Sequence, residues 1–224
     1  MENPKILITD DGSHTILLEP SMVTYHSTKG ALNESQKVYI DHGLKHLLHL
    51  QQISLFEFGF GTGLNAYLSL LQTHLTKQDI KYTSIEPYPL ASSIVSELNY
   101  PKLLKTSTED FLQMHNAEWN QTIEISEHFS LLKHQYQWNN YMPDKDIFDL
   151  VYYDAFGPGH DESLWSLAST IKLNSMMSIA GILCTFCAQG QFKRNLKASG
   201  FQVESLSGPI GKREVIRATK HSDI

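Results

Sequence analysis

The sequence predicts an α/β fold with a doubly wound, mostly parallel sheet and a C-terminal antiparallel hairpin. After residue 50, strand-like and helix-like segments alternate, which is typical of a parallel sheet covered on both faces. The last two strand-like segments follow one another across the short turn "SGPIGK". A chain of 224 residues suits one domain with one core, so we expect a single domain over residues 1–224.

The first 50 or so residues form an N-terminal extension to this pattern. Residues 6–20 alternate apolar and polar side chains around Asp10-Asp11-Gly12-Ser13, which predicts a β-hairpin. Residues 31–50 space their apolar side chains as a helix does. The extension therefore carries a hairpin and a helix.

The alternating region follows in a regular order. The least periodic stretch, about residues 106–145, is either an inserted cap facing the substrate or a long ordered loop. The predicted elements are strands at 53–59, 80–87, 129–137, 147–156, 181–187, 201–206 and 213–219, and helices at 63–75, 90–104 (closing near Pro101), 164–177 and 191–200.

Three glycines, Gly59, Gly61 and Gly63, lie directly between a predicted strand and a predicted helix. Ligands of doubly wound sheets bind at this edge, where a glycine turn allows close approach and the helix N-terminus offers free N–H groups. Leu64 stands where a dinucleotide fingerprint needs its third glycine, which argues against NAD.

Two acids accompany the glycine turn. Glu57 precedes it by two residues and suits a ligand with an ammonium group, and Glu86 ends the next strand, where an acid accepts ribose hydroxyls. Together they predict a pocket for S-adenosylmethionine (SAM). The alternative is that Glu57 is solvated and Glu86 caps a helix.

Four motifs resemble one family in the same order. They are "YHSTKGALNESQKVYIDHGL", with Tyr25, Ser27, Gly30, Glu34 and Val38 in corresponding places, "EFGFGTGLN", "DAFGPGHDESLW" and "GPIGKREV". The chain resembles, over about residues 20–218, the methyltransferase domain of the bifunctional tRNA 5-methylaminomethyl-2-thiouridine biosynthesis proteins (MnmC type).

The resemblance implies a Rossmann-like SAM-dependent methyltransferase that methylates the primary amine of 5-aminomethyl-(2-thio)uridine at the tRNA wobble position. The catalytic acid of the family maps to Asp154. The expected cofactor-binding residues are Glu57, Gly59, Phe60, Gly61, Gly63, Asn65 and Glu86, and the expected substrate-binding residues are Tyr25, Ser27, Glu34, Phe156, Pro158, Lys212 and Arg213.

The chemistry of amine methylation also favours a carboxylate at Asp154, independently of the resemblance. An alkylamine with a pKa near the lysine value of about 10.4 is mostly protonated at neutral pH, and only its neutral form can attack the methyl group. A carboxylate at the end of the fourth parallel strand can orient the amine, accept its proton or stabilise the cation that forms. The alternative is a turn residue that caps the helix beginning at "ESLW".

The other expected substrate contacts also have structural alternatives. Tyr25 and Phe156 suit core packing, and Glu34 suits a cap or a pair on its helix. Lys212 and Arg213 suit solvated charges, but residues 191–220 hold seven basic and two acidic residues, a local charge of +5 that favours phosphate contact. The whole chain carries −6, which argues against strong nonspecific binding of nucleic acid.

The sequence departs from the family in three places, one of which is that "GPGHDES" lacks the Lys-Asn of the corresponding family segment, so substrate contacts there are unassigned. His134-Gln135 stands where the family has Gly-Asp near the adenine, so adenine recognition is unassigned. The sequence has no FAD-dependent oxidase domain, so we expect other enzymes to supply the aminomethyl-uridine.

Cysteine and histidine patterns do not predict a metal site. Cys184 and Cys187 lie three apart in a strand and therefore on opposite faces. His42, His46 and His49 share one helical face, without the carboxylate of a known zinc motif.

No signal peptide or membrane-spanning run is visible, so we expect a cytoplasmic protein without membrane contact. Two other functions stay open. One is methylation of a small-molecule or protein amine, and the other is a non-catalytic SAM-fold binding module. Glu57 and Asp154 together favour an enzyme, because a scaffold needs neither.

Overall fold

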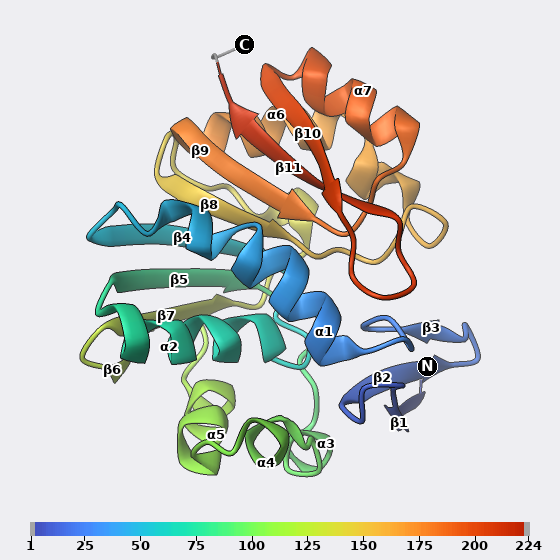
Figure 1. The fold of residues 1–224 in the computed structure, drawn as a ribbon, viewed down its shortest axis with the longest axis vertical. Helices are drawn as coiled ribbons and strands as arrows, with labels where there is room; N and C mark the ends of the chain where they lie inside the picture. The colour runs from blue at the N-terminus through green and yellow to red at the C-terminus, as the bar shows by residue number, and fades with distance from the viewer. Residues whose placement is uncertain (1–2, 222–224) are drawn as a thin grey trace.

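A computed structural model describes residues 3–221, which form a small N-terminal sheet beside a large central sheet (Figure 1). The small sheet has the order β1-β2-β3 and the central sheet the order β10-β11-β9-β8-β4-β5-β7-β6. The strands β9, β8, β4, β5 and β7 run parallel, whereas β11, β10 and β6 are antiparallel to their neighbours. The predicted parallel sheet with a C-terminal hairpin is confirmed.

The elements have the following bounds. The strands are β1 (Asn3–Ile8), β2 (His14–Glu19), β3 (Val23–Thr24), β4 (Gln52–Phe58), β5 (Asp79–Ile85), β6 (Thr122–Ser126), β7 (Phe129–His134), β8 (Phe148–Tyr153), β9 (Met177–Thr185), β10 (Phe201–Ser207) and β11 (Glu214–Lys220). The α-helices are α1 (Ala31–Ser35), α2 (Leu64–Thr76), α3 (Ser92–Val95), α4 (Tyr100–Leu104), α5 (Thr108–Asn116), α6 (Leu167–Met176) and α7 (Gly190–Ala198). A π-helix follows α1 at Gln36–Asp41, and 3₁₀-helices occupy Leu44–Leu47, Trp138–Asn140 and Glu162–Trp165.

The predicted N-terminal hairpin is confirmed by the pairing of β1 with β2. The segment 31–50, predicted as one helix, is divided into three helices of different types, which are α1, the π-helix and a 3₁₀-helix. Its histidines therefore do not share one α-helical face. His42 Nε2 lies 3.0 Å from the Ser207 carbonyl oxygen, and His46 Nδ1 lies 3.1 Å from the Arg217 guanidinium.

The predicted helix over 90–104 is wrong in its middle. The chain leaves α3 so that the Asn99 side chain binds the N-terminal hairpin, accepting from His14 N–H (3.0 Å) and donating to the Gly12 carbonyl oxygen (2.9 Å). Pro101 does not end a helix. It lies in the first turn of α4, where its missing N–H costs nothing.

Most of the stretch 106–145 is regular structure rather than an inserted cap or a long loop. It contains α5, which Ser107 caps by accepting the Glu109 N–H (3.1 Å), and the edge pair β6 and β7. The strand β6 is short and mostly polar, with a bulge in its pairing to β7. Its alternation was too brief to be visible in the sequence.

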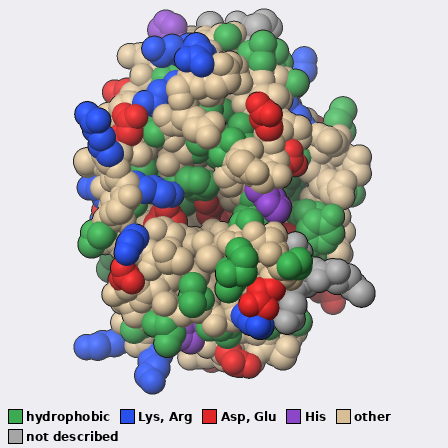
Figure 2. Space-filling view, turned by 90° about the vertical axis from the view of Figure 1, so that its right-hand side faces the viewer, with side chains coloured by type: hydrophobic (Ala, Val, Ile, Leu, Met, Phe, Trp, Pro, Cys, Tyr) green, Lys and Arg blue, Asp and Glu red, His purple; other side chains and the backbone are tan. Residues whose placement is uncertain are grey.

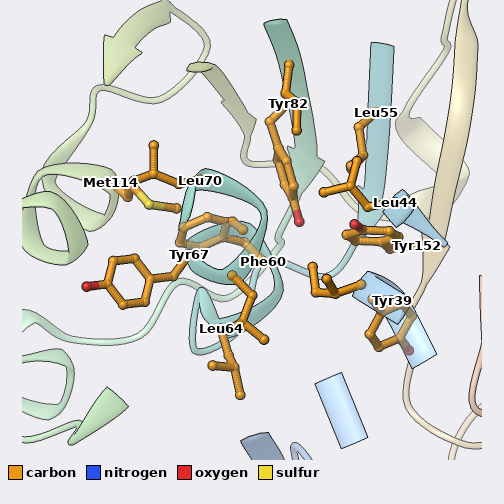
Figure 3. Close-up of a cluster of buried hydrophobic side chains, with 14 of the residues drawn as sticks. Tyr39, Leu44, Leu55, Phe60, Leu64, Tyr67, Leu70, Tyr82, Met114 and Tyr152 are labelled. Carbon is orange, nitrogen blue, oxygen red and sulfur yellow. The ribbon is translucent and has the colours of Figure 1, made fainter. Parts of the chain in front are cut away.

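Two hydrophobic layers cover the two faces of the central sheet. One contains α2, the π-helix and α5, and Figure 3 shows part of it, with Leu64 and Tyr67 of α2 on one side and Tyr82 and Tyr152 of the strands on the other. The other packs α6 and α7 against the opposite face. Cys184 belongs to the first layer and Cys187 to the second, which confirms that they face opposite sides.

The C-terminal ends of β4, β5 and β8 meet at one edge of the central sheet, and the small sheet lies beside that edge (Figure 1). This arrangement places the N-terminal extension next to the glycine turn. Within residues 3–221, the helices are too short or too polar to cross a lipid bilayer.

Candidate active site

A cavity of about 1240 Å³ opens at the C-terminal edge of the central sheet. Figure 2 shows a hollow across this face of the molecule with acidic side chains at its floor. Among the described residues 3–221, its lining includes the carboxylates of Glu34, Glu57, Glu86, Asp154 and Asp161, but a single ammonium group, that of Lys212. The excess of negative charge favours a positively charged ligand.

The glycine turn forms one wall of this cavity. Gly59, Gly61 and Gly63 have φ angles of 88°, 50° and 70°, in the left-handed region that favours glycine. A Cβ atom on Gly63 would lie 2.7 Å from His115 Nε2, so a larger residue at this position would need the histidine to move. The turn ends at α2, whose first residues Leu64 and Asn65 also line the cavity.

Glu57 is buried below the glycine turn, with 1% of its surface exposed. The Ser84 hydroxyl donates to its Oε2 atom at 3.3 Å. Burial, and then the neighbouring charge of Asp154, raise the pKa of Glu57 well above its usual value. The alternative of a solvated Glu57 is therefore wrong.

Glu86 braces the turn from the end of β5. Its Oε2 accepts the Gly61 N–H at 3.0 Å, and its Oε1 accepts the Tyr88 N–H at 2.9 Å. Burial raises its pKa, and these two hydrogen bonds oppose that effect. Glu86 does not cap the following helix, because the N-cap of α3 is Ala91.

Asp154 directly follows β8 and is held by two donors. The Tyr39 hydroxyl donates to Oδ1 at 2.6 Å, and the Asn65 side-chain amide donates to Oδ2 at 2.8 Å. Burial raises the pKa of Asp154 to about 6, although both hydrogen bonds act in the opposite direction. The alternative of a helix cap is wrong, because Asp161 caps the helix at "ESLW" by accepting the Ser163 N–H.

The opposite side of the cavity is assembled from distant segments. Glu34, 5% exposed, accepts the Ser27 N–H at 2.8 Å and forms an ion pair with Lys212. The Lys212 ammonium lies 4.0 Å from the centroid of the Phe186 ring. Near this pair, the rings of Tyr25 and Phe156 meet edge to face at 5.4 Å.

Residues 101–221 match the sequence model of a family described as S-adenosyl-L-methionine-dependent methyltransferase. The chain belongs to this family. It is therefore a SAM-dependent methyltransferase, and the acidic cavity fits the cofactor, because SAM carries a sulfonium and an ammonium group. The glycine turn fits as well, since its backbone approaches the cavity without side chains at Gly59 and Gly61.

Curated relatives of this methyltransferase include two proteins named tRNA 5-methylaminomethyl-2-thiouridine biosynthesis bifunctional protein MnmC. The one from Campylobacter fetus is 25% identical over 209 residues, covering 88% of this chain and 33% of the relative. The one from Campylobacter jejuni is 28% identical over 211 residues, covering 89% and 34%. The chain thus spans about a third of the length of these relatives.

Solved structures agree on the fold of the methyltransferase. MnmC2 from Aquifex aeolicus superposes with a TM-score of 0.78 at 22% identity, covering 100% of this chain and 72% of that one. A protein from Galdieria sulphuraria, described as a sarcosine dimethylglycine methyltransferase by inference, gives a TM-score of 0.51 at 10% identity, with 94% and 93% covered. Both establish the Rossmann-like methyltransferase fold.

Most residues expected at the site of this methyltransferase line its cavity. They are Tyr25, Ser27, Glu34, Glu57, Gly59, Phe60, Gly61, Asn65, Glu86, Asp154, Phe156 and Lys212. Gly63 shapes the turn from behind, against His115. Pro158 lines a separate pocket of about 530 Å³ next to Gln189 and Asn195, and Arg213 is exposed outside both pockets.

Sequence reasoning missed two groups of lining or supporting residues. Gln137, Trp138 and Asn139 line the cavity beyond β7, whereas His134 turns away and contacts Asn120 (3.0 Å between Nδ1 and Oδ1). Polar residues three positions beyond His134 were a usable signal, because the ends of parallel strands line such cavities. Tyr39 was also missed, because helical spacing does not distinguish a π-helix from an α-helix.

The basic segment is less available than its composition indicates. Lys193 pairs with Glu214, Arg217 with Glu204, Lys212 with Glu34 and Lys220 with Asp146. Within residues 3–221, Arg194, Lys197 and Arg213 lie outside these ion pairs.

Proposed function

We propose that this methyltransferase transfers the methyl group of SAM to the primary amine of 5-aminomethyl-(2-thio)uridine at the tRNA wobble position. The observation that carries the proposal is Asp154, a carboxylate with a pKa of about 6 that two donors orient in an acidic cavity beside the glycine turn. The names of the MnmC relatives supply the tRNA nucleoside.

On the cofactor side, we assign the SAM ammonium group to Glu57 and the ribose hydroxyls to Glu86. Both acids line the cavity on either side of the glycine turn. Both Glu86 oxygens already accept one backbone N–H, but each carboxylate oxygen keeps a second acceptor position. When bound, SAM supplies an electrophilic methyl group on a positively charged sulfur. Gln137 and Asn139 are the polar side chains available to the adenine.

On the acceptor side, Asp154 orients the amine toward the methyl group. In the reaction the amine nitrogen forms a bond to the methyl carbon, the carbon–sulfur bond breaks and its electron pair stays on sulfur. The amine loses one proton overall. An amine with a pKa near about 10.4 binds a proton more strongly than a carboxyl with a pKa of about 6. Asp154 therefore stabilises the methylated ammonium cation and passes the proton that this cation loses to solvent.

The walls around Asp154 suit an unstacked base. Tyr25 and Phe156 present aromatic rings to the cavity, and aromatic side chains stack with bases that are turned out of RNA. Ser27, Glu34 and Lys212 supply polar groups for the edge of the base. Arg213, which is exposed and follows Lys212 in the β10–β11 turn, is assigned to backbone phosphate. A tRNA substrate also implies a cytoplasmic location.

A second candidate is methylation of a small-molecule or protein amine. Two observations favour it: the cavity lining is strongly acidic, and four of the seven cations between residues 191 and 220 are already paired. Both features reduce attraction to phosphate, but neither affects a free cationic amine.

The deciding experiment supplies labelled SAM with three acceptors in parallel. They are tRNA from cells that lack this gene, free 5-aminomethyluridine, and a mixture of small amines. Conversion of aminomethyl- to methylaminomethyl-uridine in tRNA, detected by nucleoside mass spectrometry, is the expected result. Methylation of the free amines with unchanged tRNA would overturn the proposal in favour of the second candidate.

A further inference from the structure

The π-helix at Gln36–Asp41 delivers a buried phenol to the acid of the site. Tyr39 is 1% exposed, its hydroxyl donates to Asp154 Oδ1 at 2.6 Å, and its ring packs 5.1 Å from that of Tyr152. Figure 3 shows Tyr39 and Tyr152 next to each other beneath the central strands. Wide helical turns of this kind are frequently found at functional sites.

The contact does not arise from neighbouring sequence. Tyr39 and Asp154 are 115 positions apart, and the second donor, Asn65, comes from the first turn of α2. Two separate helices thus each direct one donor at one carboxylate oxygen. Donors at both oxygens stabilise the ionised carboxylate and fix the direction of its remaining acceptor positions.

We propose that Tyr39 is a positioning residue, which keeps Asp154 ionised and aimed at the acceptor amine. This inference rests on the role assigned to Asp154 under the proposed function. Tyr39 itself does not line the cavity and therefore acts through Asp154 alone.

Removal of the Tyr39 hydroxyl removes one hydrogen bond that lowers the pKa of Asp154, so burial raises this pKa with less opposition. The pKa of Asp154 then rises from about 6 toward neutrality, so a smaller fraction of the enzyme is ionised at pH 6 to 7. This substitution does not change the other titratable groups that interact electrostatically with Asp154. They are Glu34 of α1, Glu57 of β4, Tyr82 of β5 and Lys212 of the β10–β11 turn.

The test compares Tyr39→Phe with the matched control Tyr152→Phe. Both remove one hydroxyl from adjacent buried rings, but Tyr152 lies 3.1 Å from the Ser69 hydroxyl rather than on Asp154. The Asp154 carboxyl carbon is titrated by NMR in protein labelled with ¹³C-aspartate, and Asp154→Asn identifies the signal. We expect its pKa to rise by about one unit in Tyr39→Phe and to be unchanged in the control.

The kinetic readout is the pH profile of kcat with the best methyl acceptor found. In Tyr39→Phe the acidic limb shifts up by about one pH unit, which is about a fivefold loss near pH 6 with recovery above pH 8, and KM for SAM is unchanged. An unshifted NMR titration, or an equal loss at every pH, would overturn the inference. The proposed function fails separately, when the wild-type enzyme leaves tRNA unmethylated while the NMR shift is still observed.

Discussion

The two sides of the cavity are built in different ways. The side that we assign to the cofactor comes mostly from one stretch of chain, which contains β4, the glycine turn, α2 and the end of β5. The side that we assign to the acceptor joins residues 25–34, the end of β8 and the β10–β11 turn, and side-chain contacts such as Glu34 with Lys212 hold it together. Backbone geometry therefore sets the first side, and long-range side-chain contacts set the second. Substitutions on the two sides should therefore impair different properties of the enzyme.

The largest expected effect is on the acceptor side. Asp154→Asn keeps the size of the side chain but removes the charge that stabilises the amine cation, so kcat should fall by about 10²- to 10⁴-fold. SAM affinity, measured by calorimetry, should change little. Asp161→Asn is the control, because Asp161 also lines the cavity but serves as a helix cap. Loss of SAM binding in Asp154→Asn would show that the two sides are not separable.

On the cofactor side, Gly63→Ala should act through the backbone. The new Cβ would lie 2.7 Å from His115 Nε2 at a φ of 70°, so the turn should shift and SAM affinity fall about tenfold. The control is Gly159→Ala, since a Cβ there meets no atom within 4 Å. Calorimetry with SAM measures both variants. Equal affinities would mean that the turn tolerates a side chain.

The buried charge of Asp154 should also lower the free energy of unfolding. Its pKa in the folded state, about 6, lies above the usual 3.8, so the folded form loses stability as pH rises through about 6. Asp154→Asn should therefore be more stable than wild type by about 1–3 kcal/mol at pH 7.5. The difference should vanish below about pH 3, where Asp154 is neutral in both the folded and the unfolded state. Urea unfolding at the two pH values checks the sign.

The smallest expected effect concerns the rim of the acceptor side. Arg213 is exposed and outside the ion pairs of its segment, so Arg213→Ala should weaken tRNA binding only a few-fold and reduce the salt slope by about one. Lys81→Gln, near the opposite end of β5, is the matched control. A salt slope unchanged by Arg213→Ala would move the phosphate contact elsewhere.

The same contrast explains what the sequence could predict. The glycine turn, Glu57 and Glu86 were predictable because a strand, a turn and a helix fix their geometry locally. Asp154 was predictable from its motif and its place at the end of a strand. Its partner Tyr39 was not, because helix type depends on packing rather than on apolar spacing.

Neighbouring residues of one motif can lie in different pockets. Pro158 lies only two positions after Phe156, yet it lines a different pocket. Sequence proximity thus does not give the direction of a side chain in irregular chain. Only side-chain contacts between distant segments decide which residues face the acceptor.

The contact between α1 and the β10–β11 turn sets the order in which the two sides of the cavity can form during protein synthesis. Lys212 pairs with Glu34, and Ile210 N–H donates to the Asn33 side chain at 3.3 Å, so these α1 residues wait for partners that are made 177 and 178 positions later. The strands and turn of the cofactor side are complete in a nascent chain long before Lys212 leaves the ribosome. The other side of the cavity is complete only after Lys212 has been made, so a nascent chain that stops before Lys212 has no finished cavity.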